Sequence, residues 1–371
     1  MTLAEALAQI LPQLAPAAGQ EEASLEAAVG RILAEDVVSP IDVPGGDNAA
    51  VDGYAVYFED LEAAAPTALP IAGRAAAGHP FTGRLSRGAA LRIFTGAPMP
   101  AGPDTVVMQE DCRIEEGRVI LPAGIKRGIN RRRAGEDVRA GATVLAAGAR
   151  LRPQDVGLAA AVGRRRLTVA RRLRVALCAV GAAEESSRHG LGALLRQLGA
   201  EVIDRGVLPA PGAALEAALA AAADGCDAIV AGGGDAMGQA RRWEIAADPI
   251  RTMALGEIGG AVVIGLPGRP AAAIAAFLCL ARPILLRLAG ARELEARRYP
   301  LRAGFAYEKP AGRRALLYAR LAPGSDGAPV AHLLSESSGP LGADGMVDLP
   351  EALTRVEPGS MVAFLPFGEA G

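Results

Sequence analysis

Lysine is nearly absent from this sequence: it occurs only at Lys126 and Lys309, and arginine supplies almost all of the 39 basic residues. A phosphate-binding P-loop needs a lysine directly after a glycine, and neither lysine stands there. Any mechanism that requires several lysines is therefore excluded. The richness in arginine and alanine is in itself what a GC-rich genome produces, and it carries no functional meaning alone.

Histidine and cysteine are scarce and scattered. The three histidines are isolated, and none of the four cysteines stands in Cys-x-x-Cys spacing. We therefore expect no zinc site and no disulfide framework. The sequence also contains no Gly-x-Ser-x-Gly elbow and no His-Glu-x-x-His helix. The cysteines are predicted to be buried small hydrophobic residues of a cytoplasmic protein.

An excess of one charge and long apolar runs are missing as well. The 39 basic and 41 acidic residues give a formal net charge of -2, which argues against a nucleic-acid partner. A membrane span needs about 18 apolar residues, and the run Ala271–Leu288 is interrupted by Arg282 and Pro283. The first residues, Met1–Glu5, lack the basic region of a signal peptide. We therefore expect no membrane association.

The hydrophobic pattern divides the chain into regions of different type. Residues 3–17 and 22–36 are predicted to form amphipathic helices. Residues 40–135 alternate short apolar runs with Gly/Pro turns, which predicts β structure. Residues 173–290 alternate strands with helices and predict an open, mainly parallel sheet covered on both faces. Residues 297–371 return to short strands and predict a small β-barrel or sandwich.

Two glycine-rich loops follow predicted buried strands of the α/β region. The segment 232–238 begins with three consecutive glycines, which let backbone N–H groups converge on an anion. The segment 265–271 reads Gly-Leu-Pro-Gly-Arg-Pro-Ala, where two prolines fix the backbone and Gly268 allows close approach. Ligands bind beyond the carboxyl ends of strands in such sheets, so these loops can line one pocket. Each can equally be a tight turn, and neither spacing decides between the two.

Two polar segments of the β-rich region can carry chemistry. Asp47 and Asp52 flank small residues, and Asp52 is suited to hold a divalent metal or a water molecule. Thr95 lies in a Thr-Gly-x-Pro turn, where its hydroxyl can bind a phosphate or another oxyanion. The structural alternatives are an Asx-type turn at Asp47 and a turn cap at Thr95. These alternatives remain open from the sequence.

A third polar segment, Arg131–Asp137, places three guanidinium groups beside two carboxylates. Arginine is suited to bind a phosphate or oxyanion through two parallel hydrogen bonds. Asp137 can hold a metal close to such an anion. The alternative is an ordinary solvated run of charges, which the segment alone does not exclude.

Together these segments resemble the molybdopterin molybdotransferase family, the MoeA and gephyrin E-domain proteins. Residues 47–56 are similar to the family's Asp-Asn-Ser-Ala-Met-Asp-Gly-Tyr-Ala, and residues 93–110 to its Thr-Gly-Ala-x-x-Pro stretch. Residues 132–137 are similar to Arg-x-x-Gly-Glu-Asp, residues 265–270 to Gly-Leu-Pro-Gly-Asn-Pro, and residues 335–343 to Ser-x-x-Ser-x-x-Leu. The motifs stand in the family's order and extend over essentially the whole chain.

The resemblance implies an elongated, multidomain α/β plus β protein with four domains. An extended domain would comprise residues 1–39 and 137–172, with a β domain inserted at 40–136. A molybdopterin-binding-like α/β domain with a mostly parallel sheet would follow at 173–291, and a C-terminal β-barrel at 292–371. The resemblance also implies a homodimer with its active site in a cleft between subunits. A molybdopterin adenylyltransferase-type enzyme or a molybdoenzyme is the implied further partner.

The resemblance also implies a reaction. The family transfers molybdate to the dithiolene of adenylylated molybdopterin and cleaves the AMP anhydride with a divalent metal, usually Mg²⁺. Asp52, Asp137 and Thr95 would form the catalytic set, and the two aspartates would hold the metal. The residues assigned to substrates are Thr95 and Arg132 for molybdate or phosphate, Gly233, Asp235, Pro267, Gly268 and Pro270 for the pterin nucleotide, and Ser337 from the last domain.

Departures from the family pattern lie in the α/β region. Residues 232–239 lack the family's hydroxyls and terminal carboxylate, and Arg269 stands where the family has asparagine. Residues 253–258 stand in place of a Lys-Pro-Gly-Lys-Pro loop. Two hypotheses follow: an active molybdotransferase with an altered nucleotide pocket, or a catalytically degenerate paralogue that binds molybdopterin or a partner protein as carrier or adaptor. The intact motifs before residue 140 favour the first.

Overall fold

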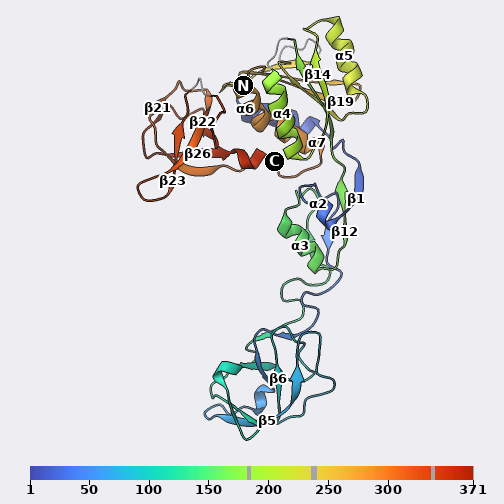
Figure 1. Ribbon diagram of the computed structural model, residues 1–371, viewed down its shortest axis with the longest axis vertical. Helices are drawn as coiled ribbons and strands as arrows, with labels where there is room; N and C mark the ends of the chain where they lie inside the picture. Colours follow the sequence, from blue (N-terminus) through green and yellow to red (C-terminus); the bar gives the residue numbers. More distant parts are fainter. Residues whose placement is uncertain (182–184, 235–239, 336–338, 371) are drawn as a thin grey trace. The chain divides into compact units, whose positions relative to one another are not determined.

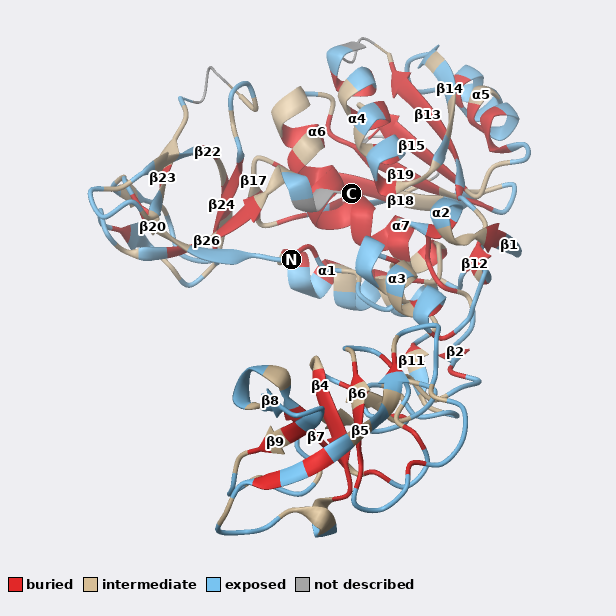
Figure 2. Ribbon diagram, turned by 60° about the horizontal axis from the view of Figure 1, so that its bottom comes forward, coloured by how far each residue is buried: buried red, intermediate tan, exposed pale blue. Residues whose placement is uncertain are grey.

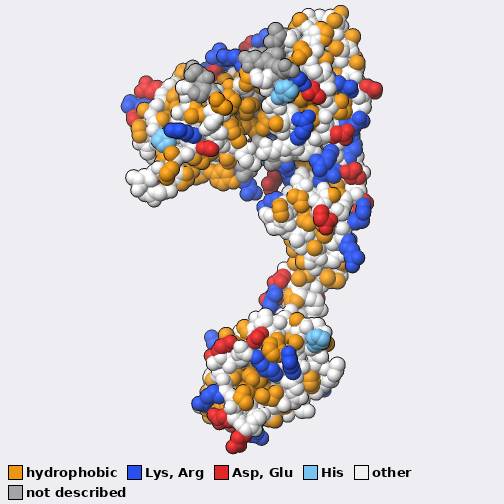
Figure 3. Space-filling view, in the orientation of Figure 1, with side chains coloured by type: hydrophobic (Ala, Val, Ile, Leu, Met, Phe, Trp, Pro, Cys, Tyr) orange, Lys and Arg blue, Asp and Glu red, His pale blue; other side chains and the backbone are white. Residues whose placement is uncertain are grey.

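The computed structural model describes residues 1–181, 185–234, 240–335 and 339–370. The chain separates into two compact units (Figure 1). Unit 1 comprises Met1–Glu35, Ala147–Arg152 and Arg166–Gly371, and unit 2 comprises Asp36–Ala146 and Pro153–Arg165. The finer division into four domains remains a prediction. In each unit, basic and acidic side chains are interspersed on the surface that Figure 3 shows.

The main sheet of unit 1 has the strand order β14–β13–β15–β19–β18–β16. The first four strands are parallel, and β18 and then β16 join through antiparallel pairings. This confirms the mainly parallel sheet predicted for the region. The strands are β13 (Arg174–Val180), β14 (Glu201–Leu208), β15 (Ala228–Gly232), β16 (Arg241–Glu244), β18 (Thr252–Ile258) and β19 (Ala261–Leu266).

Helices cover both faces of this sheet. Helix α4 (Glu185–Leu198) packs on one face and α5 (Ala213–Ala223) on the other. Along β13, Leu177 belongs to the core beneath α4, whereas Cys178 belongs to the core beneath α5. Successive side chains of a strand point to opposite faces, so a strand between two helical layers is apolar throughout. Figure 2 shows that these strands are mostly buried; β15 is buried throughout, and β13 and β19 each have a single position that is not fully buried.

A long buried helix follows β19. It consists of α6 (Pro270–Ala276), a π-helical turn (Phe277–Ala281) and α7 (Arg282–Leu288). The π turn ends two residues before Pro283, which has no N–H and whose ring would clash with a carbonyl of a regular α-helical turn. The wider turn therefore lets the helix continue through the proline.

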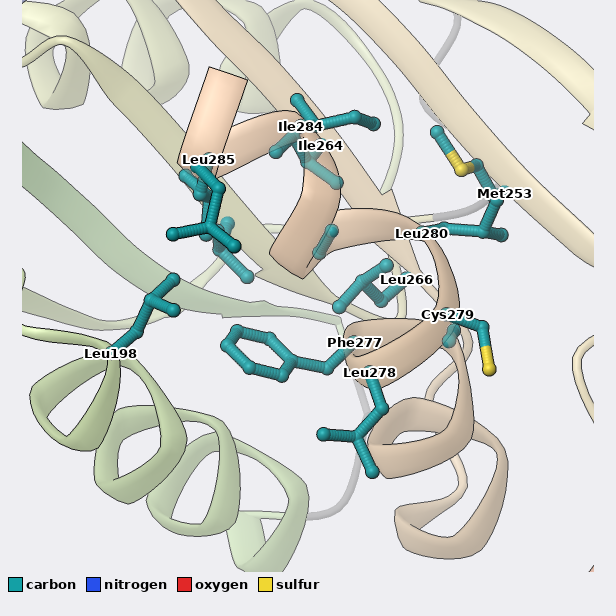
Figure 4. Close-up of a cluster of buried hydrophobic side chains, with 14 of the residues drawn as sticks. Leu198, Met253, Ile264, Leu266, Phe277, Leu278, Cys279, Leu280, Ile284 and Leu285 are labelled. Atoms are coloured by element: carbon teal, nitrogen blue, oxygen red, sulfur yellow. The ribbon is translucent and has the colours of Figure 1, made fainter. Parts of the chain in front are cut away.

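This helix forms the centre of the unit 1 core. Phe277 is fully buried, and in Figure 4 its ring points toward Leu198 of α4. Among the described residues, the stretch Pro270–Leu288 is long and apolar enough to cross a membrane by length and composition alone. However, 83% of its most apolar window is buried inside the protein. Its apolar character is thus accounted for by the core.

The C-terminal part of unit 1 is a closed five-stranded barrel. Its strands follow the order β22–β23–β20–β26–β24, and β24 pairs back to β22. A short strand, β17 (Ala247–Asp248), adds to β22 from outside the ring. The predicted C-terminal β-barrel is therefore confirmed. The ring comprises β20 (Tyr299–Ala303), β22 (Arg314–Pro323), β23 (Pro329–Leu333), β24 (Gly345–Leu349) and β26 (Met361–Pro366).

The N-terminal segment differs from the prediction. The first helix, α1 (Leu3–Ile10), continues only as a 3₁₀ turn to Gln13. The helix predicted at 22–36 is wrong. Strand β1 (Gln20–Ser24) pairs with β12 (Arg166–Ala170), and only the single turn α2 (Leu25–Ala28) is helical.

The helix prediction fails because residues 32 and 33 pair with distant segments of the chain, which the spacing of apolar residues does not reveal. The apolar positions after residue 24 have helical spacing. However, Gly30 adopts a φ of 78°, and Ile32 and Leu33 form bridges to segments more than 100 residues away in sequence. Burial of these two side chains against those segments outweighs the local helical preference.

Unit 2 is built from short strands, as predicted for the β-rich region. Its sheet has the order β7–β4–β6–β5–β9–β8, and two further pairs join β3 to β10 and β2 to β11. Helix α3 (Pro153–Ala161) packs against β11. The strands are β2 (Val37–Val38), β3 (Asn48–Ala49), β4 (Gly53–Val56), β5 (Thr67–Ala75), β6 (Ala90–Ile93), β7 (Thr105–Met108), β8 (Arg113–Glu115), β9 (Arg118–Leu121), β10 (Arg131–Arg132) and β11 (Thr143–Leu145).

Replacing Phe277 by alanine should lower the free energy of unfolding of the α/β core by about 3–5 kcal/mol, because a large cavity would remain. Trp243, the single tryptophan, belongs to the same core cluster, so its fluorescence during urea unfolding reports this region. The control is Val207→Ala on β14, where the side chain is 55% exposed. It should change stability by no more than about 0.5 kcal/mol. Equal effects of the two changes would contradict the assignment of the core.

Candidate functional site

Asp52 and Thr95 are in direct contact in unit 2. Asp52 precedes β4, Thr95 follows β6, and the pairing of Gly53 with Ile93 brings the two together. The Asp52 Oδ1 atom accepts hydrogen bonds from the Thr95 backbone N–H at 2.8 Å and from the Thr95 hydroxyl at 2.7 Å. A Cβ at Gly53 would lie 2.0 Å from the carbonyl oxygen of Val107, so only glycine fits directly after Asp52.

The environment of Asp52 favours its charged form. The two hydrogen bonds from Thr95 hold the pKa of the Asp52 carboxyl below its ordinary value, and the nearby Arg92 guanidinium adds to this effect. Asp52 is therefore ionised at neutral pH. Its Oδ2 atom accepts no hydrogen bond from the described part of the chain. The carboxylate thus offers one oxygen to a cation or a water molecule.

Arg132 and Asp137 form a second pair in unit 2. One terminal nitrogen of the Arg132 guanidinium donates to both carboxylate oxygens of Asp137. Both side chains are partly exposed, at 37% for Arg132 and 51% for Asp137. The predicted grouping of arginine with carboxylate in this segment is therefore present in the structure.

Asp47 has a structural role in this region. Strand β3 pairs with β10, and Asp47 accepts hydrogen bonds from the Arg131 guanidinium and from the Ala134 backbone N–H at 2.8 Å. These bonds hold the pKa of Asp47 below its ordinary value, against the opposing effect of its burial. The side chain of Asp47 thus joins β3 to the segment after β10, through a backbone donor 87 positions away rather than through a local Asx-type turn.

The two predicted glycine loops leave the sheet of unit 1 at the same edge. Strands β15 and β19 are parallel neighbours, with Gly232 opposite Leu266. Gly233, at a φ of 74°, and Pro267 therefore begin adjacent loops. Between β13 and β15 the strand order reverses direction, which is where open α/β sheets bind ligands. The predicted residues Asp235 and Ser337 lie outside the described residues.

Sequence reasoning missed Ser187, which tethers one of these loops. Its hydroxyl, at the start of α4, donates to the carbonyl of Gly268 at 2.6 Å. Ser187 is 3% exposed, so the bond is shielded from water. No pattern in the sequence marks this serine, because the bond joins residues 81 positions apart.

Two arginines, Arg251 and Arg269, lie near the segments of the α/β region that depart from the family pattern, and their side chains differ in their contacts. Arg251 is bound to the carboxylate of Asp248 at 2.9 Å. The Arg269 side chain is exposed and makes no hydrogen bond or ion pair with any described residue, although its backbone carbonyl accepts from the Ala273 N–H at 2.9 Å. Met253, in the stretch that stands for the family's lysine loop, lies fully buried in β18. Among these positions, Arg269 is therefore the one that offers an unengaged cation beside the nucleotide loops.

Two further observations limit the site. The described residues contain no group of three or more His, Cys, Asp or Glu side chains that could hold a metal ion. A pocket of about 350 Å³ lies among α1, the long helix and the barrel, and Asp348, Arg298 and Arg314 line it. None of the predicted site residues lines this pocket.

The chain is similar to known proteins over most of its length. The family model described as MoeA N-terminal region (domain I and II) matches residues 1–163. The molybdopterin molybdenumtransferase of Haemophilus influenzae is 35% identical over 320 residues, which are 79% of each chain. That of a Nostoc species is 32% identical over 314 residues, 76% of this chain and 72% of the relative.

Solved structures agree with these relatives. The crystal structure of the molybdopterin biosynthesis moeA protein from Pyrococcus horikoshii OT3 superposes with a TM-score of 0.84 at 26% identity. The match covers 99% of both chains. A second structure of the moeA protein from this organism gives a TM-score of 0.74 at 29% identity over the same share.

Thr95→Val should raise the pKa of Asp52 toward its ordinary value of about 3.9, because the carboxylate loses one of two hydrogen bonds. Thr95→Ser keeps the hydroxyl and should leave the pKa unchanged. The measurement is an NMR acid titration of the Asp52 carboxyl carbon, assigned with Asp52→Asn. The wild-type bonds stabilise the fold fully above the unfolded pKa, and this contribution is lost as pH falls through the lowered folded pKa. An unchanged pKa in Thr95→Val would contradict the geometry.

Proposed function

The chain belongs to the MoeA family of molybdopterin molybdenumtransferases, and on that premise we propose that it inserts molybdate into adenylylated molybdopterin and releases AMP. It is a transferase of molybdenum cofactor biosynthesis, with molybdopterin and molybdate as substrates. The observation that carries this proposal is the 35% identity over 79% of both chains. The family match over residues 1–163 also spans Asp52, Thr95, Arg132 and Asp137.

In this proposal Asp52 is the central carboxylate of unit 2. Its lowered pKa keeps it charged at neutral pH, so it can orient a water molecule or hold a cation through Oδ2. The Thr95 hydroxyl donates its proton to Asp52, which leaves that proton unavailable to an oxyanion. Thr95 is therefore a positioning residue for Asp52 in this arrangement, and the contact to molybdate or phosphate falls to arginine.

Mg²⁺ is the proposed cofactor, and Asp52 fits it better than Asp137 does. Magnesium keeps several waters and is bound through one or two carboxylates together with substrate phosphates, so a cluster of three protein ligands is not required. Both oxygens of Asp137 accept from Arg132, and the positive charge of this guanidinium disfavours a cation at the same carboxylate. When bound, Mg²⁺ would neutralise the charge that develops on the phosphates as the AMP anhydride is cleaved.

The pterin nucleotide is proposed to bind at the sheet edge of unit 1. Gly233 and Gly268 would present backbone close to the ligand, and Pro267 and Pro270 would keep the second loop rigid. The exposed guanidinium of Arg269 would contact the phosphates, since arginine binds phosphate oxygens through paired hydrogen bonds. Asp235 and Ser337 are proposed as further substrate contacts.

We further propose a cytoplasmic homodimer with its active site in a cleft between subunits. A molybdopterin adenylyltransferase-type enzyme would supply the substrate, and a molybdoenzyme would receive the product. Light scattering of the purified protein measures the mass of the assembly. A monomer at micromolar concentration would contradict the dimer.

Asp52→Asn should reduce AMP release from adenylylated molybdopterin by about a hundredfold or more, because it removes the charge while the amide oxygen can still accept from Thr95. The assay contains molybdate and Mg²⁺ and follows AMP by chromatography. Asp111→Asn, an exposed carboxylate of the same unit, serves as control and should retain full activity. Tight pterin binding by the wild-type protein without AMP release would instead establish the carrier or adaptor function.

Ser187→Ala should release the loop at Gly268 and raise KM for adenylylated molybdopterin roughly two- to tenfold, with kcat nearly unchanged. This range corresponds to the loss of one hydrogen bond of about 0.5–1.5 kcal/mol. Ser360→Ala, which removes a serine of the barrel, is the matched control. A fall in kcat at constant KM would show that the tether serves the chemical step instead.

A further inference from the structure

Two arginines of unit 2 lie opposite each other on neighbouring strands. Strands β5 and β6 are parallel, and Arg74 pairs with Arg92 in their register. Residues paired across neighbouring strands project from the same face, and such strands are about 4.8 Å apart. Like charges directly opposite each other destabilise a sheet. The repulsion between Arg74 and Arg92 therefore lowers the stability of the sheet, unless neighbouring groups or a bound ligand offset it.

An aromatic side chain supports both guanidinium groups. Phe94 stands two residues after Arg92 and so faces the same side of the sheet. The Cζ atom of Arg74 lies 4.9 Å from the centre of the Phe94 ring, and that of Arg92 lies 4.5 Å from it. Arg92 also lies 5.2 Å from the ring centre of Tyr54. Such contacts attract a cation to the ring face without using the guanidinium N–H groups, which can still donate to an acceptor.

Carboxylates do not neutralise this pair directly. Arg92 donates to the carbonyl of Gly53 at 2.9 Å and to the side-chain oxygen of Gln109, both of which are uncharged acceptors. The Arg74 side chain is exposed and, among the described residues, makes no hydrogen bond or ion pair. Asp52 interacts with Arg92 through space without a hydrogen bond between them. The Glu110 carboxylate also interacts with Arg92 through space. Arg74 is therefore the more available cation of the two.

We propose that Arg74 and Arg92 form a binding subsite for a doubly charged tetrahedral oxyanion. Guanidinium groups match the oxygens of such an anion through paired, charge-assisted hydrogen bonds. Its two negative charges would also remove the repulsion between the arginines. The Asp52 carboxylate repels anions, so the oxyanion sits on the side of Arg74 and Phe94. The ligand chemistry is shared by free molybdate, free phosphate and the phosphoryl group of a nucleotide.

This inference rests on the proposed function only for the identity of the physiological anion. Binding of an oxyanion to Arg74 and Arg92 is measurable without the pterin substrate and without turnover. A failure of the binding experiment would therefore leave the transferase assignment intact. Conversely, a protein that binds the oxyanion but releases no AMP would retain the subsite and lose the transferase proposal.

The test compares binding to the full-length protein by equilibrium dialysis with radiolabelled molybdate, radiolabelled phosphate and labelled AMP. Arg74→Gln should weaken binding at least tenfold, which corresponds to about 1.4 kcal/mol. Arg113→Gln, which removes an exposed arginine from β8 of the same unit, is the matched control and should change binding less than twofold. Phe94→Leu keeps both charges but removes the stacking platform, so it should weaken binding to an intermediate extent.

Each outcome decides one point. Binding of both free anions, with mutual competition and sensitivity to Arg74→Gln, would establish a general oxyanion subsite. Binding of AMP alone, with the same sensitivity, would assign the subsite to a nucleotide phosphoryl group. Equal losses in Arg74→Gln and Arg113→Gln would reduce the effect to overall charge and overturn the proposal. Unchanged binding in Arg74→Gln, or no binding of any of the three probes at millimolar concentration, would overturn it as well.

Discussion

The parallel pairing of β13, β15 and β19 is the constraint on which unit 1 depends. Parallel neighbours need a crossover between them, and the chain between β13 and β15 supplies α4 and α5, which cover the two faces of the sheet. The described part of the connection from β15 to β19 instead supplies the antiparallel strands β16 and β18. The carboxyl ends of the three parallel strands meet at one edge. Gly233 and the loop that starts at Pro267 stand at that edge because of this topology, and Ser187 reaches Gly268 from α4 for the same reason.

The predictable part of the fold is the part in which local pattern and tertiary packing agree. Strands β13, β15 and β19 are apolar on both faces and have glycine close to their ends, so their type and the mainly parallel sheet follow from the sequence. The strand order does not follow from it. The segment after residue 20 shows the opposite case. Leu25, Ile32 and Leu33 have helical spacing, yet burial of Ile32 and Leu33 against distant segments determines their conformation.

The predicted catalytic residues show the same limit of sequence-based prediction: local motifs identify them, but long-range strand pairing determines their contacts. Asp52 and Thr95 could each be proposed from their motifs, but their contact joins residues 43 positions apart and depends on the pairing of β4 with β6. The bond between Arg131 and Asp47 spans 84 positions. Local spacing indicates which chemical groups are present. Strand pairing decides which of them bind each other and which remain free for a ligand.

The scarcity of lysine has a different meaning in each unit. In unit 2, lysine could not replace Arg74 and Arg92 with the same contacts. Their planar guanidinium groups lie over the Phe94 ring and still have N–H donors at their edges. In unit 1, the stretch that stands for the family's lysine loop is part of β18, where Met253 and Ala254 are fully buried. A cation at those two positions would have to lose its hydration. Arg269, by contrast, lies in an exposed loop after β19, where its guanidinium keeps its hydration.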